Sequence, residues 1–113
     1  GVESLAARYK RDLRRPDRRA FAQQNLADHY WDVGDYRKAA TALGKTITPR
    51  TAPEDITETH ERIARCQVRM KKLGDAKKAL MRAHGNDWSS LIDDDDFAVM
   101  AKDSKYKKYF GLK

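Results

Sequence analysis

The sequence has one cysteine, three prolines and six glycines among 113 residues, and it has no long apolar run. The single thiol, Cys66, excludes an internal disulfide and a zinc site built from several cysteines, and it favours the cytoplasm or another reducing compartment. We expect Cys66 to be buried and unreactive, because it lies among apolar helix positions and free cysteine is often buried. No apolar stretch approaches the roughly 20 residues of a membrane-spanning helix, so we expect no membrane span. The chain starts at Gly1 rather than at Met, which leaves open a targeting segment that has been removed.

Sequence signatures of metal and catalytic sites are missing as well. His60 and Glu61 begin an H-E-x-x-H pattern, but Ala64 stands in place of the second histidine. His29 and His84 have no partners at ligand spacing, and we expect all three histidines at the surface or at its edge. No glycine-rich phosphate loop, G-x-S-x-G elbow or Cys/His pair is present. We therefore expect no enzymatic activity, no metal and no cofactor.

Four consecutive aspartates occupy positions 93–96. They lack the D-x-[DN]-x-[DN]-G spacing and the distal glutamate of a calcium loop. Carboxylates are favourable at helix N-termini, so we expect this run to cap a helix.

Basic side chains are in excess, since 24 Lys and Arg against 17 Asp and Glu give a formal net charge of +7. This surplus suits acidic protein partners, nucleic acid or anionic lipid, and does not choose among them. With 40% hydrophobic and 36% charged residues, the chain suits one helical domain with a solvated exterior. No strict alternation of apolar and polar residues predicts a strand, so the expected fold class is all-α.

The segment 26–45 predicts two helices folded against each other. Apolar residues lie at helical spacing on both sides of a turn centred on Gly34. Gly34 supplies the backbone freedom that ends the first helix, and Asp35 is a suitable N-cap for the second. Two helices joined this closely pack antiparallel. The apolar faces comprise Phe21, Leu26, Ala27, Tyr30 and Val33 before the turn, and Tyr36, Ala39, Ala40 and Leu43 after it.

Prolines divide the single domain into parts. Pro16 ends a first helix, because proline cannot continue a helix without losing a hydrogen bond. Pro49 and Pro53 lie in a loop, and Pro53 also suits the first turn of the helix that follows. The parts are an N-terminal helix (1–16), a first hairpin with helices 17–33 and 35–47, a loop (48–55), a second hairpin (54–85) with helices 54–73 and 75–84, and short C-terminal capping helices (86–113).

The glycine turn recurs along the chain. Gly74 and Asp75 repeat Gly34 and Asp35 after 40 residues, so we expect the corner of the second hairpin at Leu73, Gly74 and Asp75. One hairpin cannot bury both of its faces, and neighbouring hairpins must therefore stack to complete a core.

Around these turns the chain resembles the tetratricopeptide repeat family, whose pattern is W-x2-L-G-x2-Y followed by A-x3-F. In the first hairpin, Leu26, Ala27 and Tyr30 fit the Leu, Gly and Tyr slots. Ala39 and Leu43 fit the Ala and Phe slots that follow. In the second hairpin Ile63 and Met70 take the Trp and Tyr slots, and Cys66 and Gln67 take the Leu and Gly slots. Ala79 and Ala83 take the Ala and Phe slots that follow. The resemblance implies antiparallel helical hairpins stacked as a short right-handed solenoid, and a protein–protein interaction module that serves as a scaffold or adaptor.

Residues 83–110 resemble the segment that follows the last repeat in bacterial members of this family, where A-x-G-x-D leads into D-P-D-[LF] and a short basic helix. Such a terminal segment caps the exposed end of a solenoid. Its packing residues would be Trp88, Leu91, Phe97, Met100 and Tyr109.

The resemblance implies a partner-binding groove along the first helix of each hairpin, and the helical period also puts these residues opposite the packing faces. The wall comprises Gln24, Asn25, Asp28, Trp31 and Asp32 from the first hairpin, and Arg65, Val68, Lys71 and Lys72 from the second. Amide and acidic side chains lie at one end of this wall, and basic side chains lie at the other end. Such a wall suits an extended or helical segment of a partner protein that carries acidic groups. Trp31 is the best anchor, because aromatic residues dominate interface energetics. Its alternative role is packing against the N-terminal helix.

Chaperone-binding members of the family use a set of Lys and Asn residues to clamp a C-terminal carboxylate. The matching slots here hold Gln24, Asp28 and Arg65. An acid in this set would repel a carboxylate, so we do not expect a chaperone-tail adaptor.

Two other functions remain open from the sequence. The basic stretches 8–19 and 62–82 are compatible with nucleic-acid (RNA) binding, although their charges are spread around helices rather than interleaved with exposed aromatic residues. A stack of two hairpins also leaves an end free for self-association.

Overall fold

The computed structural model describes residue 7 and residues 19–112. Apart from residue 7, the helix expected within residues 1–16 lies outside the described residues, as does the break expected at Pro16. All regular elements of the described residues are helices and none is a strand, which confirms the all-α class.

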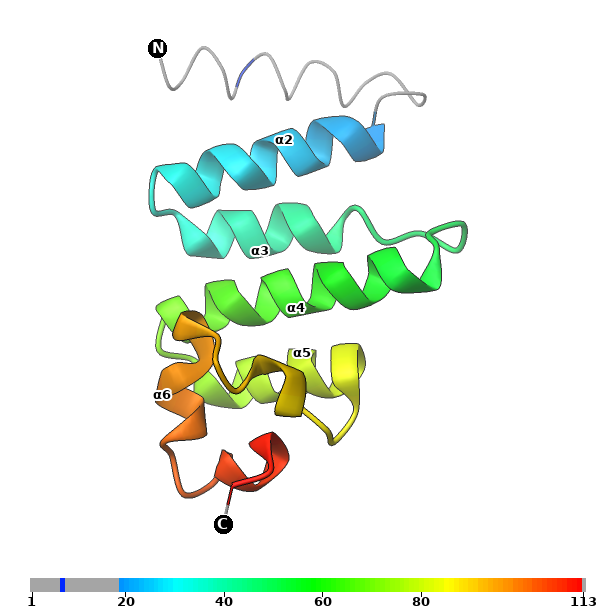
Figure 1. Ribbon diagram of the computed structural model, residues 1–113. Coiled ribbons are helices and arrows are strands. Elements are labelled where there is room, and N and C mark those ends of the chain that lie inside the picture. Colours follow the sequence, from blue (N-terminus) through cyan, green and yellow to red (C-terminus); the bar gives the residue numbers. More distant parts are fainter. Residues whose placement is uncertain (1–6, 8–18, 113) are drawn as a thin grey trace.

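Four helices form the body of the part of the chain that the structure describes: α2 (Arg19–Asp32), α3 (Tyr36–Gly44), α4 (Pro53–Arg69) and α5 (Leu73–His84). They lie side by side in chain order, each antiparallel to the one before it (Figure 1). A C-terminal segment of short pieces follows, and it packs across α4 and α5. Its pieces are η2 (Ser89–Leu91), η3 (Asp95–Phe97), α6 (Ala98–Ala101) and η4 (Lys107–Phe110).

Most helix ends follow the local chemistry of the sequence. The Asp35 side chain accepts a hydrogen bond from the Lys38 backbone N–H at 3.1 Å and caps α3, as expected. Pro53 opens α4, with Glu54 and Asp55 in its first turn. Gly85, with φ of 62°, ends α5. Helix α3 ends at Gly44, earlier than the predicted residue 47.

The predicted corner of the second hairpin is wrong. Gly74 lies within the first turn of α5, and the chain reverses at Met70, Lys71 and Lys72 instead. Lys71 takes the left-handed conformation, with φ of 62°. Burial explains why the corner lies before Leu73. When α5 starts there, Ala76, Ala79 and Leu80 lie in the core at 0, 4 and 0% exposure.

The two corners have the same backbone hydrogen bonds once this shift is made. The N–H of Asp35 donates to the Tyr30 carbonyl at 2.8 Å, and the N–H of Lys72 donates to the Gln67 carbonyl at 2.8 Å. Asp35 and Lys72 then accept equivalent bonds from Ala39 and Ala76. The hairpins therefore repeat after 37 residues, from Asp35 to Lys72, and not after 40.

Substitutions at the left-handed residue of each corner should change stability in opposite directions. Lys71→Gly should raise the free energy of unfolding by up to about 1 kcal/mol, because a residue with a Cβ is strained at positive φ. Gly34→Ala should lower it by about 1 kcal/mol, since φ is 81° there while a Cβ would meet no atom within 4 Å. Urea denaturation measures both effects. A loss of stability in Lys71→Gly, with Gly74→Ala as the neighbouring control, would contradict the assigned corner.

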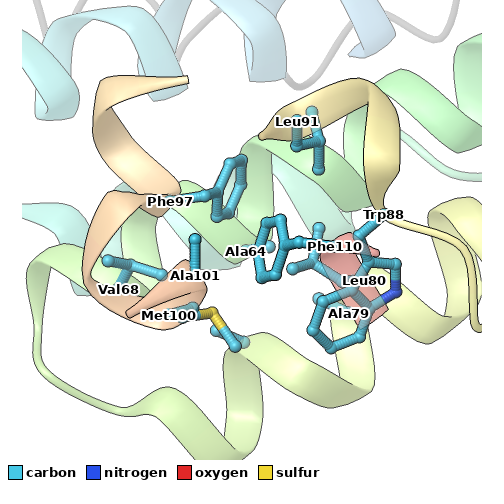
Figure 2. Packing of buried hydrophobic residues seen from close by; sticks show 11 residues of the cluster. Ala64, Val68, Ala79, Leu80, Trp88, Leu91, Phe97, Met100, Ala101 and Phe110 are labelled. Atoms are coloured by element: carbon cyan, nitrogen blue, oxygen red, sulfur yellow. The ribbon is translucent and has the colours of Figure 1, made fainter. Parts of the chain in front are cut away.

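The C-terminal segment completes the core of the second hairpin. Trp88, Leu91, Phe97 and Met100 are buried, as predicted, and the half-buried Tyr109 stacks on Trp88 with ring centroids 4.3 Å apart. Figure 2 shows Trp88, Leu91, Phe97 and Met100 gathered over α4 and α5. They share one cluster with Ala64, Val68, Ala76, Ala79, Leu80, Ala101 and Phe110.

Cys66 is fully buried, which confirms the expectation for the thiol. Burial raises the pKa of Cys66 to about 11, so the thiol stays protonated at neutral pH. The expectation for the histidines is wrong for His29, which is buried on α2, whereas His60 and His84 are half-buried.

Two apolar residues assigned to the packing face of the first hairpin are exposed instead. Phe21 is 68% exposed and Val33 is 49% exposed. Phe21 lies one position before the buried pair Ala22 and Leu26, about 100° around the helix from that face. Val33 lies beyond the last residue of α2, where α3 no longer covers it.

Candidate binding groove

Three arginines line one face of α4. Arg62, Arg65 and Arg69 follow one another at spacings of three and four residues, so their side chains share a helical face. Their carboxylate partners come from α2, from the C-terminal segment and from Glu61 of α4 itself, and Tyr36 of α3 also binds Arg69.

Arg62 connects α4 to α2. Its guanidinium donates to the Asp28 carboxylate at 2.6 Å. The two side chains are 34% and 60% exposed, so the ion pair contributes at most about 1 kcal/mol to stability. Its main effect is to fix the orientation of two side chains across the gap between the helices.

Arg65 binds the C-terminal segment. Its guanidinium donates to the carboxylates of Asp94 at 2.8 Å, Asp96 at 3.1 Å and Glu61 at 3.2 Å. It also lies 5.0 Å from the centroid of the Phe97 ring. Burial alone would lower the pKa of Arg65, but the hydrogen bonds and charge of Asp94, followed by the bonds to Asp96 and Glu61, raise it.

Arg69 joins the C-terminal segment to the first hairpin. It donates to Asp96 at 2.7 Å and to the Tyr36 hydroxyl at 3.2 Å. Its guanidinium carbon lies 4.5 Å from the centroid of the Trp31 ring. The hydrogen bonds to Tyr36 and Asp96 raise the pKa of Arg69.

A cavity of about 490 Å³ opens between α2 and α4, with α3 at its base. Trp31 is half-buried at its wall and makes an edge contact with Tyr36, at 5.0 Å between ring centroids. This volume falls within the range of known ligand pockets. The lining residues are Ala27, Asp28, Trp31, Asp32, Ala39, Leu43, Arg62 and Arg65.

The structure brings four of the nine predicted groove residues to this cavity: Asp28, Trp31, Asp32 and Arg65. The other five lie elsewhere. Gln24 lines a different hollow beside the loop 48–52, and Asn25 is half-buried outside the cavity. Val68 is 8% exposed in the core, while Lys71 and Lys72 form the corner before α5. The alternative role of Trp31, packing on the N-terminal helix, concerns residues outside the described range.

Sequence reasoning missed Arg62 and Arg69, although their helical spacing from Arg65 is visible in the sequence. It also missed the partners Asp94 and Asp96, which lie 29 and 31 residues from Arg65. The aspartate run does cap a helix as predicted, since Asp94 accepts from the Asp96 N–H at 2.9 Å and precedes η3. Its pairing with the arginines is a separate role.

Among residues 7 and 19–112, no group of three or more His, Cys, Asp or Glu side chains is placed to hold a metal ion. In the same part of the chain, no helix combines the length and apolar character needed to cross a membrane.

Comparison with known proteins gives no assignment, because no protein-family model, no curated protein and no solved structure matches this chain.

Proposed function

We propose that this chain is a non-catalytic protein-interaction module, similar to tetratricopeptide repeats, that binds a segment of a partner protein in the cavity between α2 and α4. The observation that carries the proposal is this cavity, in which half-exposed Trp31 lies beside paired charges. An anchor ring next to polar groups is the usual composition of an interface centre.

The 37-residue repeat supports the family proposal. In this register, Ile63 and Ala64 correspond to Leu26 and Ala27, which fit the Leu and Gly slots of the family pattern. The Ala and Phe slots that follow then hold Ala76 and Leu80, and both residues are fully buried. The second hairpin thus fits the pattern better than it does with its corner at Gly74.

Trp31 is suited to act as an anchor because its orientation is already fixed. The edge contact with Tyr36 and the Arg69 guanidinium 4.5 Å from its ring centroid hold the indole in place. A side chain ordered before binding loses little conformational entropy when a partner arrives.

Trp31→Ala should weaken binding of the partner segment by about 2 kcal/mol, or roughly 30-fold, as expected for an aromatic anchor. Peptides selected against the wild-type chain from a displayed random library are titrated against both proteins by isothermal calorimetry. Phe21→Ala is the matched control, because Phe21 is an aromatic residue of the same helix that is 68% exposed and lies outside the cavity. Equal affinity of the selected peptides for wild type and Trp31→Ala would contradict a binding site in this cavity.

Nucleic-acid binding is the second candidate function. The observation that favours it is a basic surface around Tyr109, where the ammonium groups of Lys77 and Lys108 lie 5.6 and 5.3 Å from the ring centroid. The guanidiniums of Arg62, Arg65 and Arg69, by contrast, are paired with carboxylates. Fluorescence anisotropy with RNA and DNA at 50 and 200 mM salt distinguishes the two functions. Phosphate binding predicts a loss of affinity of about 1,000-fold or more over this range if six or more contacts form.

A further inference from the structure

Among the residues that the structure describes, the charged groups that line the cavity, together with the ion pairs joined to them, are acidic in sum, although the whole chain is basic. Five carboxylates stand against three guanidiniums there, and at physiological ionic strength charges act over only about 8 Å, so these local groups decide which partner is attracted. The carboxylates belong to Asp28, Asp32, Glu61, Asp94 and Asp96, and the guanidiniums belong to Arg62, Arg65 and Arg69.

The arginines have little capacity for an acidic partner. Arg65 already binds three carboxylates, and Arg62 binds Asp28 at 2.6 Å. Asp32 differs from them, since it is exposed, lines the cavity and makes no ion pair with any residue that the structure describes. The groups left for a partner are therefore anionic: Asp32, and Asp28, whose side chain stays 60% exposed beside Arg62.

The second hairpin shows how a segment docks on this kind of surface. The chain's own C-terminal segment brings Asp94 and Asp96 to Arg65 and Arg69, followed by the buried Phe97. Phe97 belongs to one packed cluster with Ala64, Val68 and Leu80, and Figure 2 shows its ring directed toward this cluster.

The repeat of 37 residues gives each of these positions in the second hairpin an equivalent in the first hairpin, where the charges are reversed. Asp28 and Asp32 correspond to Arg65 and Arg69. The positions that hold Ala64, Val68 and Leu80 in the second hairpin hold Ala27, Trp31 and Leu43 in the first, and these three line the cavity. Phe97 packs on these positions in the second hairpin. In the first hairpin Ala27 and Leu43 are buried in a cluster with Cys66 of α4, and Trp31 is left half-buried at the cavity.

From this correspondence we infer that the partner segment is basic, with lysine or arginine opposite Asp28 and Asp32 and an apolar side chain, such as phenylalanine, in the cavity beside Trp31. The inference rests on the proposed function and adds the chemistry of the partner. Its charge is opposite to the acidic partner that the sequence alone suggested. Arg65 of the expected basic end is bound within the chain by Asp94 and Asp96, and Lys71 and Lys72 lie at the corner before α5, outside the cavity.

Three fluorescein-labelled peptides test the charge of the partner. They share neutral flanks and differ only in a central Lys-Ala-Lys-Phe, Glu-Ala-Glu-Phe or Gln-Ala-Gln-Phe. Each is titrated by anisotropy against wild type, Asp32→Lys and Trp31→Ala. Asp55→Lys is the control with the same change of net charge, because Asp55 is exposed and lines a different hollow at the start of α4.

The lysine peptide should bind wild type at least about 10-fold more tightly than the glutamate peptide, because Asp28 and Asp32 attract lysine and repel glutamate. Asp32→Lys should reduce that affinity about 5- to 10-fold, whereas Asp55→Lys should change it less than about 2-fold. Equal affinity of the lysine peptide for Asp32→Lys and wild type would overturn the inference.

The other outcomes separate this inference from the proposed function. If the glutamate or glutamine peptide binds best and Trp31→Ala removes that binding, the charge of the partner is wrong and the cavity is still the binding site. If no peptide shows binding that depends on Trp31, the inference and the proposed site both fail.

Discussion

Replacing Trp88 with alanine is expected to lower the free energy of unfolding by about 3–5 kcal/mol. Trp88 is fully buried, stacks on Tyr109 and makes an edge contact with Phe110 at 5.5 Å between ring centroids. Its indole N–H donates to the Gly85 carbonyl at 2.8 Å. The substitution therefore removes packing, leaves a cavity and removes the donor of the Gly85 carbonyl. Urea denaturation followed by circular dichroism measures the loss, which approaches the total stability of many single domains.

Ile92→Ala is the control for this experiment, because Ile92 lies in the same C-terminal segment but is 40% exposed. We expect it to cost less than about 1 kcal/mol. If Trp88→Ala also cost less than that, the C-terminal segment would not fold cooperatively with α4 and α5.

The second large effect is expected for Arg65→Met, which should lower the free energy of unfolding by about 2–3 kcal/mol. The change leaves Asp94 without its basic partner beside Glu61 and Asp96, which keep His84 and Arg69 as partners. Breaking a fully buried ion pair costs roughly 3–5 kcal/mol, and we expect less here because the four side chains are 22–23% exposed and water screens the remaining charges.

Arg62→Met is the matched control on the same face of α4. Its partner Asp28 is 60% exposed, so the loss should stay below about 1 kcal/mol. A double-mutant cycle of Arg65→Met with Asp94→Asn should then give a coupling energy of about 1 kcal/mol or more. Zero coupling would show that Arg65 does not hold the C-terminal segment.

The sequence predicts the first hairpin better than the second because the first follows local rules. Gly34 occupies the left-handed position of its corner, and Asp35 caps the next helix. In the second hairpin Lys71 takes the left-handed position, so a search for Gly and Asp finds Gly74 three residues too late. The packing of α5 against α4 fixes the corner, and no local signal reports that packing.

The residues of the candidate site also differ in how well the sequence predicts them. Asp28, Trp31 and Asp32 follow from the helical period of α2, which identifies the face opposite Leu26. The partners of Arg65 could not be predicted, because Asp94 and Asp96 reach it only after the chain has folded back across α4. For the same reason the sequence suggests that Arg65 is free to bind a partner, whereas in the structure three carboxylates bind it.

A nuclear magnetic resonance titration of the isotope-labelled chain with a library-selected peptide tests the central claim most directly. The account predicts intermolecular contacts between the peptide and the Trp31 indole, with shifted amide signals along α2 and near Arg62 and Arg65 on α4. Shifted signals confined to α5 and Lys107–Phe110, with an unchanged Trp31 indole, would contradict it.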